Sequence, residues 1–214
     1  MNTVISQYTF DDYIKDAVRT ESTLLPLTKE VEQRGLSNRL FHAILGLETE
    51  IKEMYDVFES GNTDLDIVNL MEECGDAYWY LAIAFDELKI EETTLLLDNL
   101  SHCANGFNLA RNELSSLRIT CGEVLDHCKK VMFYGKQLDT EMVSGHIHRA
   151  YCLVGYMVAH CNYRVPYVLN TNIAKLKARY PEKFTATNAE VRDLDAERAI
   201  LEKGLSKWKS LLML

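Results

Sequence analysis

The amino-acid sequence predicts an all-α protein with a four-helix bundle at its core. Apolar residues recur every three or four positions through most of the 214 residues, which is the spacing of one face of a helix. Three prolines and ten glycines leave long uninterrupted stretches, and no stretch has the alternating pattern of a strand. A chain of this length can bury one sizeable core, so we expect a single domain over residues 1–214.

The first part of the chain predicts three helices separated by turn signals. A first helix covers residues 10–23, and Asn38 is the expected N-cap of a second helix over residues 39–58. The Ser-Gly-Asn-Thr-Asp sequence at residues 60–64 is typical of a turn, and a third helix follows over residues 66–88.

The remainder of the chain predicts further amphipathic helices. They are expected at about residues 92–133, 141–162, 173–179 and 189–214. Pro166 and a cap at Asn170–Asn172 are expected to precede the third of these helices, and Pro181 is expected to end it. The last range is expected to form a charged helix or a partly ordered tail.

The hairpin predicted over about residues 38–90 recurs in degenerate form over about residues 108–163. A shift of 73 residues places identical residues on one another: Leu65-Asp66 on Leu138-Asp139 and Ala77-Tyr78 on Ala150-Tyr151. Before the turn the matching shift is 70 residues, which places Glu53 on Glu123. The two shifts differ by three residues, and the difference falls in the turn, where insertions are tolerated. Two tandem hairpins predict a pseudo-two-fold four-helix bundle; the alternative is chance similarity between two amphipathic hairpins.

Composition and charge exclude several classes of function. The net charge of −9 argues against binding to polymeric nucleic acid, which needs clustered cations, but allows a nucleotide because a bound metal can invert the charge of an acidic pocket. No apolar run reaches the roughly 18 residues of a membrane span, and the N-terminus lacks a signal-peptide pattern. The six cysteines form no CxxC pair, so buried free thiols in a cytoplasmic protein are expected.

Two pairs of acidic residues are the candidate metal ligands. Glu50 and Glu53 lie three residues apart on the second predicted helix, and Glu73 and Asp76 do so on the third, so each pair shares one helix face. If the two helices pair antiparallel, the four carboxylates converge and repel one another by several kcal/mol. A hard divalent cation such as Mg²⁺, or Mn²⁺ as a substitute, relieves that repulsion, whereas thiol or imidazole ligands for zinc are absent from both pairs.

The alternative for each pair taken singly is a solvated acidic face. The context of the second pair argues against it, because Glu73 and Asp76 run directly into the bulky apolar residues 77–82. Gly75 in the same helix costs about 1 kcal/mol relative to alanine, which indicates a close helix approach or access for a ligand.

The spacing of these acids resembles the signature of a known family. Glu50-x-x-Glu53, nineteen residues, then Glu73-x-x-Asp76 is similar to the ExxE…ExxD pattern of the MazG-like all-α NTP pyrophosphatases. A second match lies near the C-terminus and reads Asn172-Ile173-Ala174-Lys175-Leu176-x-x-Arg179-Tyr180-Pro181-x-x-Phe184. The resemblance covers roughly residues 10–88 and 170–200, although Ile14 stands where the family usually has glutamine.

The resemblance implies Mg²⁺-dependent hydrolysis of a nucleoside triphosphate to the monophosphate and pyrophosphate. It assigns the metal to the four acids. A carboxylate that the metal does not fully engage can orient or deprotonate the attacking water, and we expect Glu53 in this role, with Glu50 as the other catalytic carboxylate. Relatives in phage genomes commonly act on deoxynucleotides, which favours a dNTP, with dGTP as one candidate. Family members usually build the bundle from two chains, so a homodimer or higher homo-oligomer is expected.

The closing segment is expected to contact the substrate. Lys175 and Arg179 lie four residues apart on one helical face, which suits phosphate oxygens. Asn172 is expected either to cap that helix or to contact sugar or phosphate. Tyr180 and Trp79 are expected either to stack on a base or to pack in the core.

One departure from the family concerns the turn of the hairpin. In the family a single hairpin carries both the acids and a basic, aromatic turn, whereas here that turn matches residues 129–139 of the second hairpin. At the four acid positions the second hairpin has Thr120, Glu123, His146 and Arg149, so only Glu123 is still acidic. We therefore expect one metal site per chain, with Lys129 and Lys136 of the second hairpin either contacting phosphate or forming a solvated turn.

Two other functions are compatible with the sequence. One is a dUTPase-like or dCTPase-like house-cleaning enzyme, because related all-α pyrophosphatases share the acidic signature. The other is a non-catalytic helical interaction protein in which the acids are vestigial.

Overall fold

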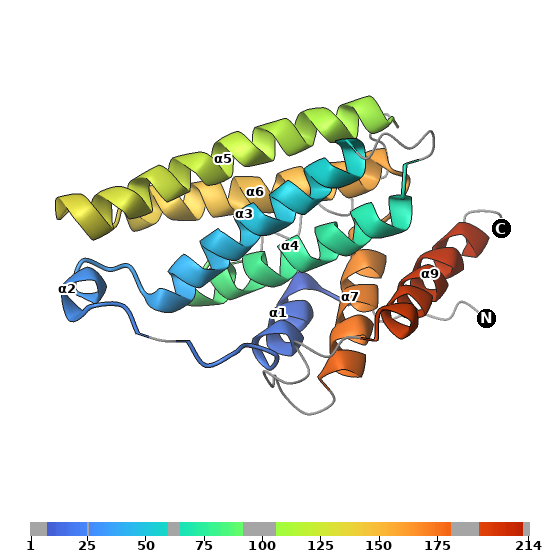
Figure 1. Cartoon of the computed structure of the whole chain (residues 1–214), viewed down its shortest axis with the longest axis horizontal. Coiled ribbons are helices and arrows are strands. Elements are labelled where there is room, and N and C mark those ends of the chain that lie inside the picture. The colour runs from blue at the N-terminus through green and yellow to red at the C-terminus, as the bar shows by residue number, and fades with distance from the viewer. Residues whose placement is uncertain (1–7, 25, 60–64, 92–105, 181–192, 212–214) are drawn as a thin grey trace.

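The apolar periodicity of the sequence is realised as a set of packed helices (Figure 1), seen in a computed structural model that describes residues 8–24, 26–59, 65–91, 106–180 and 193–211. The helices are α1 (Phe10–Val18), α2 (Lys29–Glu32), α3 (Asn38–Glu59), α4 (Ile67–Leu88), α5 (Phe107–Tyr134), α6 (Thr140–His160), α7 (Val165–Arg179) and α9 (Leu194–Leu211). No strand occurs within these ranges, which confirms the predicted all-α class.

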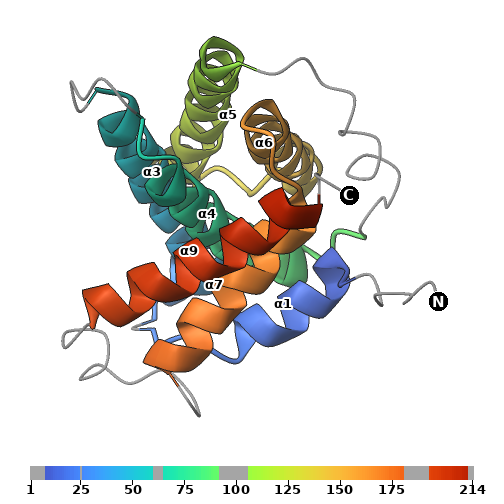
Figure 2. The same ribbon diagram turned by 90° about the vertical axis from the view of Figure 1, so that its right-hand side faces the viewer.

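Four long helices form the bundle at the centre of the fold. α3 pairs with α4 as one hairpin and α5 with α6 as a second, while α3 also packs on α5 and α4 on α6. Figure 2 shows α1, α7 and α9 as a further layer beside α4. α4 therefore contacts helices on several sides, and it contributes ten buried residues to a hydrophobic core that runs from α1 to α9.

The two hairpins share features that the sequence repeat predicts. Asp66 and Asp139 cap α4 and α6 in the same way, each accepting a hydrogen bond from the backbone amide three residues on, at 3.0 Å. Tyr78 and Tyr151 meet edge to face between the hairpins, with ring centroids 5.5 Å apart. Both features are expected of a pseudo-two-fold bundle, while the internal duplication itself stays a prediction.

Several predicted helix ends were wrong. α1 ends at Val18 rather than residue 23, and the short α2 was not predicted. The cap of α3 is Ser37, whose Oγ accepts from the amide of Leu40 at 3.0 Å, so Asn38 is already helical. The turn at 60–64 and the range 92–105 lie outside the described residues.

The largest correction concerns α7, which begins at Val165 rather than after Asn172. Pro166 occupies the first turn, where its missing N–H is tolerated, so it starts the helix instead of breaking it. Asn170 donates a side-chain hydrogen bond to the carbonyl of Pro166 at 2.8 Å and lies within the helix. Asn172 is therefore not a cap, and it presents its side chain from the middle of α7.

Two expectations from composition can be compared with the structure. Among the described helices, none has the length and apolar character needed to cross a bilayer. The described cysteines are free thiols, and all of them except Cys152 are buried. Cys103 lies outside the described residues.

Glycines allow two close approaches around α4. A Cβ on Gly46 of α3 would lie 2.0 Å from the ring of Tyr80 on α4, and a Cβ on Gly75 of α4 would lie 2.9 Å from the Cβ of Asn172 on α7. The second contact confirms the close helix approach expected from Gly75. These glycines let α3 and α7 both approach the segment of α4 that carries Glu73 and Asp76.

We expect Gly46→Ala to lower the free energy of unfolding by about 1–3 kcal/mol, because the added methyl group overlaps the Tyr80 ring and forces it to move. Urea unfolding measures this change. The matched control is Gly145→Ala in α6, where nothing lies within 4 Å, and there the higher helix propensity of alanine should raise stability by up to about 1 kcal/mol. Equal midpoints for Gly46→Ala and the wild-type protein would contradict the proposed packing role.

Candidate metal centre

Three of the four predicted carboxylates converge between α3 and α4. Glu50, Glu73 and Asp76 each offer an oxygen, and these oxygens lie within 4.8 Å of one another. We call these residues the acidic trio. Glu53, one helical turn beyond Glu50, is exposed at the side of the trio rather than within it. Helical spacing thus brings the acids together as the sequence predicts, with one of them at the rim.

The surroundings of the acidic trio disfavour the ionised form of two of its three carboxyls. Burial, followed by the charges of Asp76 and Glu53, raises the pKa of Glu50 to about 8. Burial and the charges of Asp76 and Glu50 raise the pKa of Glu73 to about 9. Without a metal, these two carboxyls therefore retain protons near neutral pH.

Asp76 is held on both oxygens by side chains of α7. The amide of Asn172 donates to Oδ1 at 2.6 Å, and the ammonium of Lys175 contacts Oδ2 at 2.5 Å. Lys175 is fully buried and also contacts Glu72 at 3.1 Å. Although burial opposes its charge, the carboxylates of Asp76 and Glu72 raise the pKa of Lys175. We call this arrangement of Asn172 and Lys175 around Asp76 the Asp76 clamp.

α1 supports the clamp from behind. The hydroxyl of Tyr13 donates to Oδ1 of Asn172 at 2.7 Å and lies 3.1 Å from the carbonyl of Gly75. Tyr13 is fully buried, so its hydroxyl has no water to replace these partners. The Asn172 amide is thereby fixed with its NH₂ group toward Asp76.

The donor set suits a hard divalent cation. All ligand atoms of the acidic trio are carboxylate oxygens, which Mg²⁺ and Mn²⁺ prefer. The trio also opens into a cavity, so water or substrate oxygens can complete the coordination shell. Across the described residues no other group of three His, Cys, Asp or Glu side chains is arranged this way.

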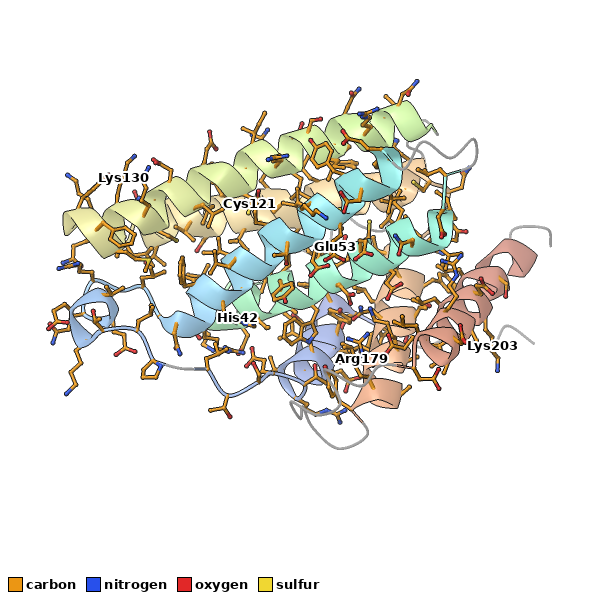
Figure 3. All side chains as sticks on the ribbon, viewed as in Figure 1. His42, Glu53, Cys121, Lys130, Arg179 and Lys203 are labelled. Carbon is orange, nitrogen blue, oxygen red and sulfur yellow. The ribbon has the colours of Figure 1, made fainter. Side chains whose placement is uncertain are left out.

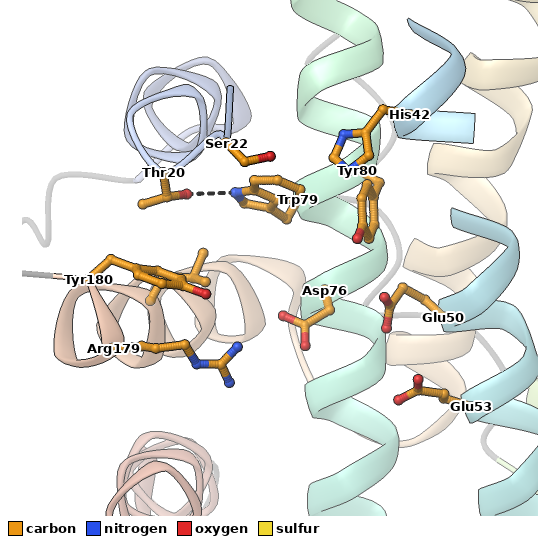
Figure 4. A pocket seen from close by; sticks show the side chains of 11 residues that line it. Thr20, Ser22, His42, Glu50, Glu53, Asp76, Trp79, Tyr80, Arg179 and Tyr180 are labelled. Carbon is orange, nitrogen blue, oxygen red and sulfur yellow. Dashed lines mark hydrogen bonds between the residues drawn. The ribbon is translucent and has the colours of Figure 1, made fainter. Parts of the chain in front are cut away.

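The cavity beside the trio has a volume of about 370 Å³ and two chemically distinct ends (Figure 4). One end carries Glu50, Glu53, Asp76 and Arg179. The other end carries hydroxyl and aromatic groups contributed by Thr20, Ser22, His42, Trp79 and Tyr80, and Tyr180 lies along the side.

The aromatic end of the cavity is fixed by contacts with α1 and the residues after it. The indole N–H of Trp79 lies 2.8 Å from Oγ1 of Thr20 and 3.2 Å from the carbonyl of Ala17. His42 packs edge to face on Tyr80, with ring centroids 5.5 Å apart, and burial lowers its pKa. This end therefore offers a neutral imidazole and aromatic surface rather than charge.

The closing segment has different roles from those expected. Arg179 and Tyr180 line the cavity, as a substrate contact requires. Lys175 does not face the cavity, so the expected contact with phosphate is replaced by its contacts with Glu72 and Asp76. Asn172 likewise contacts Asp76 instead of acting as a cap. Pro181 and Phe184 lie outside the described residues.

The lysines of the second hairpin are not brought to the site. Lys129 pairs with Asp126 on its own helix, and Lys136 is exposed beyond the end of α5. In Figure 3 the labelled neighbour Lys130 lies at the far end of α5 from Glu53. The expectation that Lys129 and Lys136 contact phosphate does not fit this placement, and the solvated-turn alternative does.

The second hairpin also lacks an acidic cluster of its own. At its equivalent positions Glu123 pairs with His146 at 3.3 Å. Its surface hollow is lined by both signs of charge, from Asp126 and Lys130 among others. This arrangement agrees with the expectation that the metal-binding acids belong to the first hairpin alone.

Sequence reasoning missed several groups that shape the site. Tyr13 and Glu72 act through the Asp76 clamp, and His42 lines the cavity two helical turns before Glu50. The position of His42 was predictable. Gly46 and Glu50 follow it by four and eight residues, so all three lie on one face of α3. Nothing local in the sequence indicates that Tyr13 reaches Asn172, 159 residues away.

The chain has no match among protein-family models, curated proteins or solved structures.

The metal-free protein is expected to lose stability as pH rises. The unfolded chain ionises Glu50 and Glu73 near their ordinary pKa of 4.5, whereas the folded chain holds their protons up to about pH 8 and 9. Between these values the folded state binds more protons, so the free energy of unfolding falls with pH, by at most about 1.4 kcal/mol per pH unit for each group.

If the acidic trio binds Mg²⁺, it does so with ionised carboxylates, so Mg²⁺ should raise the melting temperature more at pH 8 than at pH 6. Thermal unfolding at both pH values, with Mg²⁺ or with EDTA, measures the effect. Glu50→Gln should reduce both the pH dependence and the response to Mg²⁺. An equal response to Mg²⁺ at the two pH values would contradict this assignment.

Replacing Lys175 tests whether it serves the fold or the substrate. Lys175→Met should lower the free energy of unfolding by about 3 kcal/mol even without nucleotide, because it leaves Glu72 and Asp76 without their buried counter-charge. Lys177→Met is the control, since Lys177 is half exposed in its pair with Asp16 and should contribute less than about 1 kcal/mol. Equal urea midpoints for the two variants would contradict the buried role.

Proposed function

We propose that the protein is a Mg²⁺-dependent nucleoside triphosphate pyrophosphohydrolase that produces a nucleoside monophosphate and pyrophosphate. The observation that carries the proposal is the acidic trio, with its oxygens within 4.8 Å, at the charged end of a cavity whose other end is aromatic. A nucleotide has the same division into a charged polyphosphate and a flat, largely apolar base. The ExxE…ExxD resemblance supports the same activity.

In the proposed complex, the two ends of the cavity receive different parts of the substrate. The triphosphate extends toward Glu50, Asp76 and Arg179, where metal and guanidinium meet its charge. The nucleoside lies toward His42 and Trp79, whose rings offer stacking surface. A neutral imidazole both donates and accepts one hydrogen bond, so His42 can contact the edge of the base.

The residues of the chain divide the chemical work. Mg²⁺ held by the acidic trio would neutralise charge on the phosphate oxygens. Glu53 lies at the rim, outside the trio, and its carboxylate accepts the proton of the attacking water. Water adds to phosphorus as the anhydride between the α- and β-phosphates breaks, and pyrophosphate leaves. The Asp76 clamp fixes the orientation of the Asp76 carboxylate, which would be one of the groups that hold the metal.

The substrate class within this proposal is a deoxynucleoside triphosphate, with dGTP as one candidate. Steady-state hydrolysis of all eight canonical triphosphates and of dUTP, with Mg²⁺ and with Mn²⁺, identifies the base and sugar. Preference for dUTP or dCTP would instead make the protein a house-cleaning enzyme with the same chemistry. Binding of neither metal nor nucleotide in calorimetry would favour a helical interaction protein.

Glu50→Gln and Asp76→Asn should each reduce Mg²⁺-dependent pyrophosphate release by about a hundredfold or more, because loss of a direct ligand exceeds the 10–100-fold effect of outer-shell partners. Circular dichroism should show an unchanged fold for Glu50→Gln. Asp76→Asn also removes one counter-charge of the buried Lys175, so its activity is measured below its own melting temperature. The control is Glu123→Gln, at the position of the second hairpin that matches Glu53, which should leave the rate unchanged. Full activity in both ligand variants would refute the site.

A further inference from the structure

An ion pair joins the cavity to α9. Arg179, at the end of α7, contacts Glu197 of α9 with two parallel hydrogen bonds, of which the one from Nε to Oε1 measures 2.8 Å. The two side chains are only 14% and 6% exposed. Arg179 also lines the cavity, where it is the only lysine or arginine among the described lining residues.

Other contacts already attach α9 to the rest of the protein. Leu201 and Leu205 are buried, and Gly204 lets α9 approach Thr171 of α7 so closely that a Cβ would lie 2.3 Å from its hydroxyl oxygen. Arg198 contacts Asp66 at 3.0 Å on the surface. A buried ion pair adds little to such docking, since the loss of hydration largely offsets its attraction. The pair between Arg179 and Glu197 therefore calls for another explanation.

The geometry of the pair fixes the plane of the guanidinium. An arginine side chain carries its N–H donors in a rigid planar fork, so two parallel bonds to the carboxylate of Glu197 fix the orientation of the whole group. Figure 4 shows the guanidinium at the charged end of the cavity, extended toward Asp76. A long side chain with many rotamers is thereby held in one orientation before a ligand arrives.

We propose that Glu197 is a positioning residue that holds Arg179 ready for the polyphosphate tail of the substrate. The inference rests on the proposed function and adds α9 to the site. In this arrangement the positive charge that meets the substrate comes from Arg179 at the end of α7, held by Glu197 of α9. It does not come from the lysines of the second hairpin.

The test is a double-mutant cycle of Glu197→Gln and Arg179→Ala in the full chain. KM and kcat are measured with the best triphosphate, the dissociation constant of inorganic triphosphate is measured with Mg²⁺ by calorimetry, and the melting temperature is recorded. Glu197→Gln alone should raise KM and the dissociation constant about tenfold, as expected for loss of one well-placed charged hydrogen bond, with a smaller change in kcat. In the Arg179→Ala background, Glu197→Gln should change neither KM nor the dissociation constant of triphosphate.

A purely structural role predicts a different pattern. In that case Glu197→Gln lowers the melting temperature and leaves KM and triphosphate binding unchanged, or it shifts them equally with and without Arg179. Either result overturns the inference. Arg198→Ala, which loosens α9 without touching Arg179, should not alter triphosphate binding, and an effect equal to that of Glu197→Gln would likewise overturn it.

The hydrolysis and binding measurements distinguish failure of this inference from failure of the proposed function. If the wild-type protein binds inorganic triphosphate but hydrolyses no nucleotide, the proposed function fails, while the binding cycle still decides the role of Glu197. If nucleotide is hydrolysed and Glu197→Gln behaves as wild type, only the positioning role fails. If the wild-type protein binds no triphosphate, the inference is overturned.

Discussion

The site depends above all on the buried contact between Lys175 and Asp76. A fully buried ammonium is stable only beside carboxylates, and Asp76 keeps its orientation only with Lys175 and Asn172 against it. Those contacts require α7 to approach α4 closely, which Gly75 permits, and they require Tyr13 of α1 to orient Asn172. These polar contacts thus connect α1 and α7, which lie outside the four-helix bundle, to α4 at the acidic trio, beside the apolar contacts of the core.

The cavity is lined by more acidic than basic side chains. Near Asp76 the protein supplies one buried cation from the closing segment, which is too little for the acidic trio and Glu72 together. Burial accordingly leaves Glu50 and Glu73 protonated when no metal is bound. In the proposed enzyme a divalent cation neutralises the remaining negative charge, so the feature that lowers stability at high pH would also favour binding of the metal. Arg179, held from α9, places the opposite charge where the anionic substrate is expected.

How much the sequence predicts depends on the range of the interaction involved. Helical periodicity predicts that Glu50 faces Glu73 and Asp76, because that needs only spacing and one antiparallel pairing. Helical periodicity does not distinguish a lysine that faces the cavity from one that is buried against Glu72 and Asp76. Lys175 was therefore expected at the phosphates. Pro166 was misplaced because proline both ends and begins helices, and Tyr13 was missed because its partner lies far along the chain. The all-α class and the bundle were therefore predictable, whereas the outer support of the site was not.

The edge-to-face meeting of Tyr78 and Tyr151 lies where the two hairpins face each other. In a bundle assembled from two identical chains, any substitution at such an axis is copied to the other half. Here both halves belong to one polypeptide, so each position can change alone. Arg149 can occupy the counterpart of Asp76, and His146 that of Glu73, without placing a basic side chain in the acidic trio. A single chain thus lets one half of the bundle keep a cluster of acids that the other half does not share.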